Sequence, residues 1–337
     1  MFLSKAPSGI YYLWFRNERG KRQKVSTRCR RKSDALRFLQ SFKMERSHRK
    51  QPKLFSDFKR DFLLYSQGHL SSGTVTGYHA SLDNFQLITG DPPICSITPK
   101  HLDMYKLERL KKIAPVTVNI ELRALRAAFN TAVRWKLLES SPFKGTKFVP
   151  IAEAAPSFFS KADFQKLISV IKECWLREVV IFATLTGLRR SEITNLKWND
   201  VDFNRKIVSV QSTPTFRTKT GKSRIVPLNE TGIYLLKSRH GKDISEHVFT
   251  LNGRKISEGW LTHKFKYYVY ECRFPNDRLR FHSLRHTFAS WLVQDGCSIY
   301  VVKELLGHSD VKTTQIYSHL SASELHKEVN KISLRLN

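Results

Sequence analysis

Apolar residues recur at helical spacing through most of the N-terminal half of the chain. Ala35, Phe38, Leu39 and Phe42 follow the spacing i, i+3, i+4, i+7, which predicts a short amphipathic helix. Between about residues 54 and 138 the same spacing predicts a helical module. Its stripes are Val75, Tyr78, Leu82 and Phe85, then Val118, Leu122, Leu125, Phe129 and Val133. Strand patterns come before these helices, at residues 11–15 and 22–25, with a turn at 17–20 between them.

A segment with repeated Pro and Gly separates this module from a second patterned region. Pro142, Gly145, Pro150 and Pro156 punctuate it, which predicts an interdomain linker. A helix start follows at Ser160, then strands at residues 207–210 and 225–226, then further helices. The pattern therefore predicts a mainly α protein with small β-sheets and several domains. Their expected limits are 1–50, 54–140, a linker at 141–156, and 157–337.

The charge balance points to a polyanionic partner. The chain has 337 residues, and 58 Lys and Arg against 29 Asp and Glu give a net charge of +29. Between Arg16 and Lys50 stand 14 basic and three acidic residues, which favours phosphate contacts over a merely solvated surface. The longest apolar stretch has ten residues, short of the roughly 18 that span a bilayer. Five widely spaced cysteines favour a reduced, intracellular protein. We expect a cytoplasmic, nucleoid-associated protein.

Two motifs with well-known chemistry are incomplete. Gly221, Lys222 and Ser223 would end a phosphate-binding loop, but Phe216 occupies the position of the required earlier glycine. His282 and His286 have the i, i+4 spacing of a zinc-binding helix, but Ser283 stands where the catalytic Glu would be. We therefore expect neither a cofactor nor a metal ion.

A set of basic residues and one tyrosine remains, in five motifs. The motifs are TGLRRSE at 186–192, TKTGKSR at 218–224, HSLRH at 282–286, LLGHSD at 305–310 and TTQIY at 313–317. Gly307 predicts a helix C-cap with His308 directly beyond it. Each motif alone is typical of an ordinary surface or core position. Together and in this order, they resemble the active-site set of tyrosine recombinases of the phage-integrase family, over roughly residues 157–320.

The resemblance implies that six residues are catalytic. They are Arg189, Lys219, His282, Arg285, His308 and Tyr317. The tyrosine would attack the DNA phosphate and form a covalent 3′-phosphotyrosyl bond, while the two arginines neutralise its nonbridging oxygens. His282 would accept the phenol proton, and His308 would donate a hydrogen bond to the phosphate.

The proton for the leaving 5′-oxygen has several candidate donors. Arg217, Lys219 and Lys222 compete near the predicted hairpin, and arginine is a poor acid because it almost never loses its proton. Lys219 takes the family's catalytic position, and His282 is the next candidate.

Three further roles stay open at this point. Glu192 is expected either to orient Arg189 or to form a plain surface pair with it. Arg190 is an extra basic residue beside Arg189, and a role shared by the two stays open. An apolar stripe after Tyr317 would dock either on its own domain or on a neighbouring protomer. It consists of Leu325, Val329 and Ile332.

The resemblance implies a site-specific DNA recombinase that needs neither a metal ion nor ATP. The helical module would be the core-binding domain, and residues 1–50 a small arm-binding domain. Double-stranded DNA would be the partner, with core and arm sites, bound by a homotetramer helped by accessory excision or DNA-bending factors. Integration of a phage or other mobile element is the leading interpretation. The alternatives are a chromosome-dimer resolvase, a type IB topoisomerase and a DNA-binding regulator that retains the fold.

Overall fold

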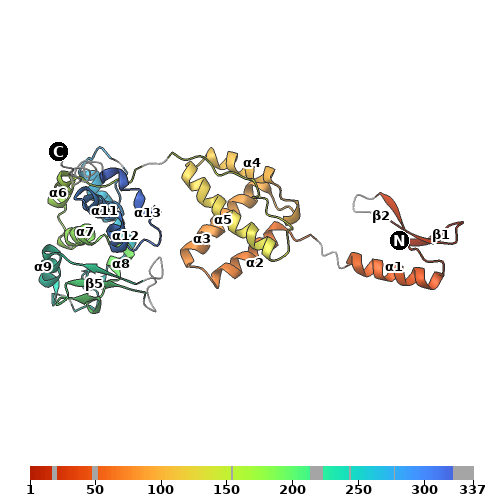
Figure 1. Ribbon diagram of the computed structural model, residues 1–337, viewed down its shortest axis with the longest axis horizontal. Helices are drawn as coiled ribbons and strands as arrows, with labels where there is room; N and C mark the ends of the chain where they lie inside the picture. Colours follow the sequence, from red (N-terminus) through yellow and green to blue (C-terminus); the bar gives the residue numbers. More distant parts are fainter. Residues whose placement is uncertain are drawn as a thin grey trace, which may run out of the picture. The chain divides into compact units, whose positions relative to one another are not determined.

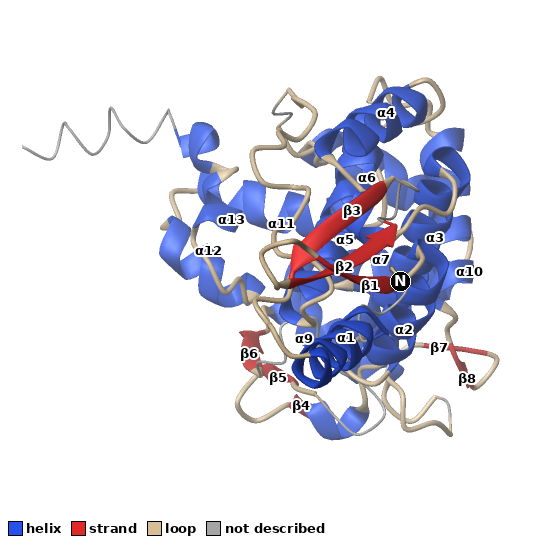
Figure 2. Cartoon of the chain, turned by 90° about the vertical axis from the view of Figure 1, so that its right-hand side faces the viewer, coloured by secondary structure: helices blue, strands red, loops and turns tan. Residues whose placement is uncertain are grey.

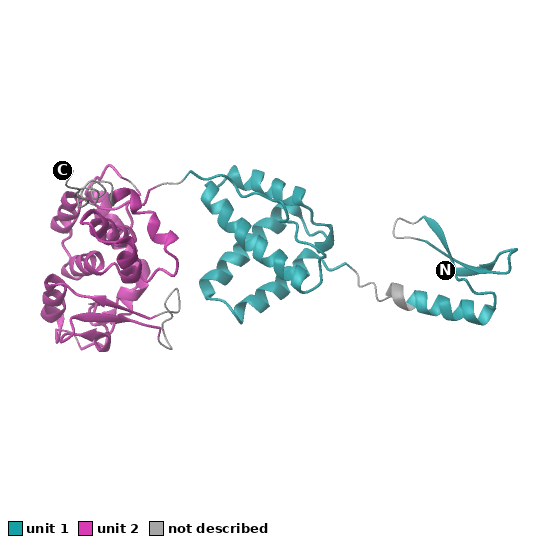
Figure 3. Cartoon of the chain, viewed as in Figure 1, with its two compact units in different colours: residues 1–152 teal, residues 153–337 magenta. Residues whose placement is uncertain are grey.

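The chain forms two compact units, residues 1–152 and 153–337 (Figure 3). The computed structural model describes residues 1–16, 21–47, 52–152, 155–212, 223–242, 244–276 and 278–321. Helices dominate both units, and the strands of the described residues form three small antiparallel sheets (Figure 2). The predicted fold class, mainly α with small sheets and several domains, is confirmed. Within the described ranges, no helix is long and apolar enough to cross a membrane.

The first unit begins with a three-stranded sheet and one helix (Figure 1). The elements are β1 (Phe2–Lys5), β2 (Tyr11–Arg16), β3 (Arg22–Ser26) and α1 (Lys32–Ser47). The strands pair in the order β1-β2-β3, and Leu13 of the central strand is fully buried. The rings of Phe15 and Phe42 lie 5.1 Å apart and join the sheet to α1. The patterns had predicted β2, β3 and α1 but not β1, and the predicted turn lies outside the described residues.

A helical module follows in the same unit. Its elements are α2 (Phe55–Gln67), α3 (Ser72–Thr89), η1 (Ile94–Ser96), α4 (Pro99–Leu110) and α5 (Pro115–Arg134). Aromatic rings fill its core, with Phe55 and Phe85 5.2 Å apart and Phe129 against both. Part of the expected linker packs on this core, because Asn119 of α5 exchanges two hydrogen bonds with the backbone of Val149, at 2.8 and 2.9 Å.

The second unit contains the five motifs. Its helices are α6 (Lys161–Val170), α7 (Cys174–Thr186), α8 (Arg190–Thr194), η2 (Trp198–Asp200), α9 (Glu230–Arg239), α10 (Glu258–Glu271), α11 (Ser283–Gln294), α12 (Ile299–Leu306), α13 (Lys312–Gln315) and η3 (Ser318–Ser321). Its strands are β4 (Val201–Asp202), β5 (Ile207–Val210), β6 (Arg224–Pro227), β7 (Thr250–Leu251) and β8 (Arg254–Lys255). The sheet order is β4-β5-β6, and β7 pairs with β8. The short β7–β8 hairpin was not predicted.

The apolar helix α7 lies at the centre of this unit. Its buried side chains form one core with residues of α9, α10 and the β4-β5-β6 sheet. A smaller core joins α11 and α12 around Ala289, Val302 and Leu306. The ends of α7 and α12 and the start of α11 therefore meet, and these are the segments that carry the motif residues.

Candidate active site

Arg189 stands at the junction between α7 and α8. Gly187 ends α7 in the left-handed conformation, with φ of 62°, and a Cβ there would lie 2.4 Å from the ring of Phe288. Arg189 is the N-cap residue of α8, and its backbone N–H donates to Glu192 Oε2 at 2.8 Å. Its Nη1 donates to Glu192 Oε1 at 2.9 Å. The tight turn and this return contact fix the direction of the Arg189 side chain.

Glu192 is a buried carboxylate, not a member of a surface pair. It is 3% exposed, and besides Arg189 it binds Arg224 of β6. Arg224 Nη1 and Nη2 donate to its two oxygens at 2.9 and 2.6 Å. Burial opposes the charged form of Glu192, but the bonds and charge of Arg224, helped by Arg189, outweigh it and lower the pKa to about 2. The acid is therefore ionised at neutral pH.

Arg285 is buried on α11 and donates to two backbone carbonyls. Its Nη1 reaches the oxygen of Gly187 at 2.7 Å, and its Nη2 reaches that of Leu306 at 2.6 Å. Both carbonyls stand at helix C-terminal ends, which carry partial negative charge and favour a cation. Burial, and next the charge of Arg189, lower the pKa of Arg285 to about 9. The group is thus a cation at neutral pH in a site crowded with other cations.

His308 follows the end of α12. Gly307 is the predicted C-cap, with φ of 66°, so that this prediction is confirmed. The Nδ1 of His308 lies 2.9 Å from Thr314 Oγ1. Burial and the charge of Arg285 lower the pKa of His308 to about 4, so the ring is neutral at pH 7. A neutral imidazole with one nitrogen directed to Thr314 keeps its other nitrogen for a ligand.

Tyr317 is buried, and its hydroxyl contacts a histidine. The side chain is 1% exposed within the small core of α11 and α12. Its oxygen lies 2.6 Å from Nδ1 of His286. Burial and the nearby His282 lower the pKa of His286 to about 4, so the ring is neutral at pH 7 and shares a hydrogen bond with the phenol. Burial raises the pKa of Tyr317 to about 12, against the opposite influence of Arg285.

The hydroxyl of Tyr317 is bonded to His286, whereas His282 was the expected proton acceptor. It is the exposed N-cap residue of α11, and its ring meets that of His286 edge-on, with centroids 4.9 Å apart. The charges of Arg285, Arg189 and His282 act on the pKa of His308, and that of Arg285 acts on the pKa of Tyr317, so these residues belong to one site. Five of the six predicted residues thus lie together. Lys219, like its competitors and the apolar stripe of the tail, lies outside the described residues.

The structure separates Arg190 from Arg189. Arg190 Nε donates to Glu258 at 2.9 Å and its Nη1 donates to Thr262 at 2.6 Å, both on α10. It therefore braces α8 against α10. Two residues of the site were missed as participants by sequence reasoning, Arg224 and His286. Both stand inside the motifs TKTGKSR and HSLRH, and this position was the only sign in the sequence that they belong to the site. The motifs do not indicate which residues they contact.

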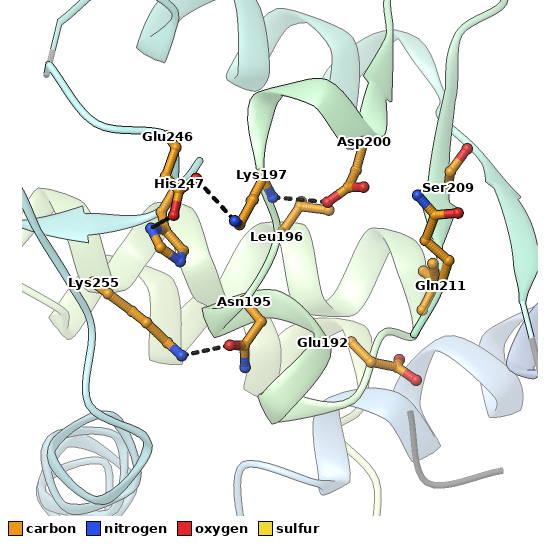
Figure 4. A pocket seen from close by; sticks show the side chains of 11 residues that line it. Glu192, Asn195, Leu196, Lys197, Asp200, Ser209, Gln211, Glu246, His247 and Lys255 are labelled. Carbon is orange, nitrogen blue, oxygen red and sulfur yellow. Dashed lines mark hydrogen bonds and ion pairs between the residues drawn. The ribbon is translucent and has the colours of Figure 1, made fainter. Parts of the chain in front are cut away.

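A pocket borders Glu192 on the side of β5 (Figure 4). Lys197 in its wall pairs with Glu246 at 2.8 Å, and Lys255 donates to Asn195. Two lysines and three carboxylates (Glu192, Asp200 and Glu246) line the pocket, so it has no surplus of positive charge to offer an anion. No group of three or more His, Cys, Asp or Glu side chains suited to a metal ion occurs in the described ranges. The cluster around Glu192 and Arg285 is the candidate site.

Comparisons with known proteins identify the family and the fold. Residues 157–324 match the phage integrase family. A tyrosine recombinase of Pseudothermotoga lettingae is 29% identical over 282 residues, which cover 81% of this chain and 96% of the relative. The Tn1549 transposon integrase, solved with a circular intermediate DNA, has a TM-score of 0.70, 18% identity, and covers 82% of this chain and 99% of its own. A lambda integrase dimer bound to a core site has a TM-score of 0.67 and 17% identity, covering 99% of this chain and 97% of its own.

The arginine cluster beside a tyrosine suits the transfer of a phosphoryl group. With the family match, the chain belongs to the phage integrase family and is a tyrosine recombinase, an enzyme of site-specific recombination that cleaves and rejoins DNA.

Loss of the Glu192 charge should destabilise the protein. Glu192→Gln leaves the guanidinium groups of Arg189 and Arg224 without their counter-ion beside the buried Arg285, and we expect the free energy of unfolding at pH 7 to fall by about 3 kcal/mol. The folded pKa of about 2 lies below the unfolded value, so this contribution is complete above about pH 4.5 and is lost as the pH falls towards 2. Urea denaturation at several pH values measures both effects. Glu258→Gln, at an exposed pair, is the control, with an expected change below about 1 kcal/mol. Equal losses in the two variants would contradict this prediction.

Removing the partner of the buried phenol should expose Tyr317. In His286→Leu the hydroxyl has lost its hydrogen-bond partner, and an unpaired buried hydroxyl costs about 1–3 kcal/mol. We expect nitration of Tyr317 in DNA-free protein to rise roughly tenfold relative to that of Tyr270, which is 80% exposed. Peptide mass analysis measures both residues in one sample. His286→Asn retains an acceptor and should show a smaller rise. An unchanged ratio in His286→Leu would show that the bond does not keep the phenol buried.

Proposed function

We propose that the chain cuts and rejoins double-stranded DNA through a covalent bond between Tyr317 and a 3′-phosphate, in the integration and excision of a mobile element. The observation that carries this proposal is the cluster of Arg189, Arg224 and the buried Arg285, which has Glu192 as its one close carboxylate among the described side chains. Such a group has a surplus of positive charge beside a tyrosine. A phosphodiester supplies the missing negative charge.

The proposed reaction assigns a task to each side chain. The phenolic oxygen of Tyr317 attacks phosphorus, and the bond to the 5′-oxygen breaks. Arg189 and Arg285 neutralise the charge that builds on the nonbridging oxygens, and the unpaired nitrogen of neutral His308 donates a hydrogen bond there. Lys219 gives a proton to the 5′-oxygen, and His282 takes the proton of Tyr317. Because the phosphotyrosyl ester conserves the bond energy, rejoining by a 5′-hydroxyl needs no ATP.

The resting position of Tyr317 adds a step before attack. A hydroxyl that is buried and bonded to His286 does not reach a phosphate, so the segment after α12 has to move when DNA binds. The lambda integrase and Tn1549 integrase structures with DNA support a DNA-bound state for this chain also. A lambda integrase tetramer has been seen on a Holliday junction, which supports a homotetramer here. We place the protein in the cytoplasm with the nucleoid, and accessory excision or DNA-bending factors complete the proposed assembly.

Residues 1–50 are proposed as an arm-binding domain, and the helical module as the core-binding domain. The N-terminal sheet carries cations over aromatic rings, with Lys24 Nζ 5.4 Å from the ring centre of Tyr12 and 5.7 Å from that of Trp14. The likeness to lambda integrase extends over 99% of this chain, and so includes this segment. The basic excess between residues 16 and 50 gives it affinity for phosphate. A chromosome-dimer resolvase is compatible with the same findings; the basic N-terminal module favours an integrase.

Tyr317→Phe tests the covalent step. The variant should still shift duplex DNA in a gel, because the basic surfaces are intact, but give no denaturation-resistant adduct on a nicked suicide substrate. The substrate carries a core sequence taken from a direct repeat that flanks the gene. Tyr300→Phe, at an exposed tyrosine of α12, is the matched control and should give the adduct of the unmodified protein. An adduct of normal yield from Tyr317→Phe would refute the assignment.

Deletion of residues 1–50 tests the arm-binding proposal. The shortened protein should form the adduct at a core site at the same rate within about twofold, because every described residue of the site lies in the second unit. It should lose footprints at sequences distant from the crossover point, and the salt dependence of its binding should become shallower. Unchanged footprints would assign the segment to folding or solubility.

A further inference from the structure

Arg224 joins three segments of the candidate site. It is the first residue of β6, and two of its nitrogens bind the carboxylate of Glu192 on α8. Its Nε donates at 3.2 Å to the carbonyl of Leu305 in the last turn of α12. One side chain thus connects the β5–β6 hairpin, α8 and the end of α12. All three of its nitrogens donate to protein acceptors, so its side chain is held by the protein itself.

The end of α12 holds the Arg224 side chain from the other side. A Cβ on Gly307 would lie 2.6 Å from Arg224 Cδ, so the backbone before His308 packs directly on the aliphatic part of this arginine. The Arg224 side chain is 9% exposed. With a carboxylate on one side and backbone on the other, Arg224 has one orientation available.

Arg224 and Arg189 share one oxygen atom. Glu192 Oε1 accepts from Nη1 of both arginines, each at 2.9 Å. The position in which Arg224 holds the carboxylate therefore determines where Arg189 is held. Without Arg224, Glu192 Oε2 would keep only the backbone N–H of Arg189, and a bidentate pair with the Arg189 guanidinium would draw that group towards the protein.

We propose that Arg224 is a positioning residue for DNA cleavage, which fixes the Glu192 carboxylate and through it directs the Arg189 guanidinium to the scissile phosphate. This inference rests on the proposed function, because it takes Arg189 to act on a phosphate. It gives a chemical signature that a purely structural arginine lacks. If Arg224 acts through Arg189, substitution of Arg224 slows cleavage only when the phosphate carries the negative charge that Arg189 neutralises.

The test compares two suicide substrates. One has an ordinary phosphate at the cleavage position, and the other has a methylphosphonate, in which a methyl group replaces one nonbridging oxygen and removes its charge. The rate of adduct formation is measured in single turnover on both, and their ratio is taken within one protein preparation. Because both rates scale with the fraction of folded protein, their ratio does not depend on it. A partly unfolded variant is therefore still informative. The variants are Arg224→Lys, Arg224→Gln and, as the reference, Arg189→Lys.

The matched control is Arg239→Lys. Arg239 is 11% exposed, pairs with Glu178 and donates to the carbonyl of Val248, so it is an equally buried arginine of the same unit outside the site. We expect the ratio of methylphosphonate to phosphate rates to rise roughly tenfold in Arg189→Lys and in both Arg224 variants, and to stay unchanged in Arg239→Lys. A raised ratio in Arg189→Lys with equal losses on both substrates in the Arg224 variants would overturn the inference alone. No adduct from the unmodified protein would overturn the proposed function and this inference with it.

Discussion

The site depends on one buried carboxylate among three guanidinium groups. Glu192 binds Arg189 and Arg224 directly, and Arg285 lies close enough for its charge to act on the others. Like charges gathered in a poorly hydrated site repel strongly, and a single acid does not balance three cations. The site therefore has a surplus of positive charge. Because its guanidinium groups are held in fixed directions, this surplus suits the oxygens of a phosphate.

Helix ends supply the rest of the compensation. α7 and α12 both end at a glycine in the left-handed conformation, and Arg285 donates to a carbonyl at each end. The glycines serve two purposes there. They allow the left-handed turn, and they leave room for the ring of Phe288 at Gly187 and for Arg224 at Gly307. Backbone dipoles in this way stabilise a cation that would otherwise find burial costly.

Sequence patterns predicted the structural features that depend on residues close together in the chain. The helices of the first module, the N-cap at Ser160 and the C-cap at Gly307 follow from spacing and capping residues within one turn. Two-residue strands such as β7 and β8 are too short to carry a period and were missed. The contact of His286 with Tyr317 joins residues 31 positions apart. This contact depends on how the chain after α12 packs back on α11. The spacing of residues in the sequence does not predict such tertiary packing.

The resting structure keeps the proposed nucleophile inactive for two linked reasons. With a pKa of about 12, only about one Tyr317 side chain in 100,000 is ionised at pH 7, and burial keeps even that fraction from DNA. Burial is also the main cause of the raised pKa, while the charge of Arg285 acts in the opposite direction. A movement that frees the phenol from its apolar surroundings and leaves it beside the arginines would thus both expose it and favour its ionisation. Exposure and activation are then one event, and the energy for it comes from the phosphate that the arginine cluster lacks.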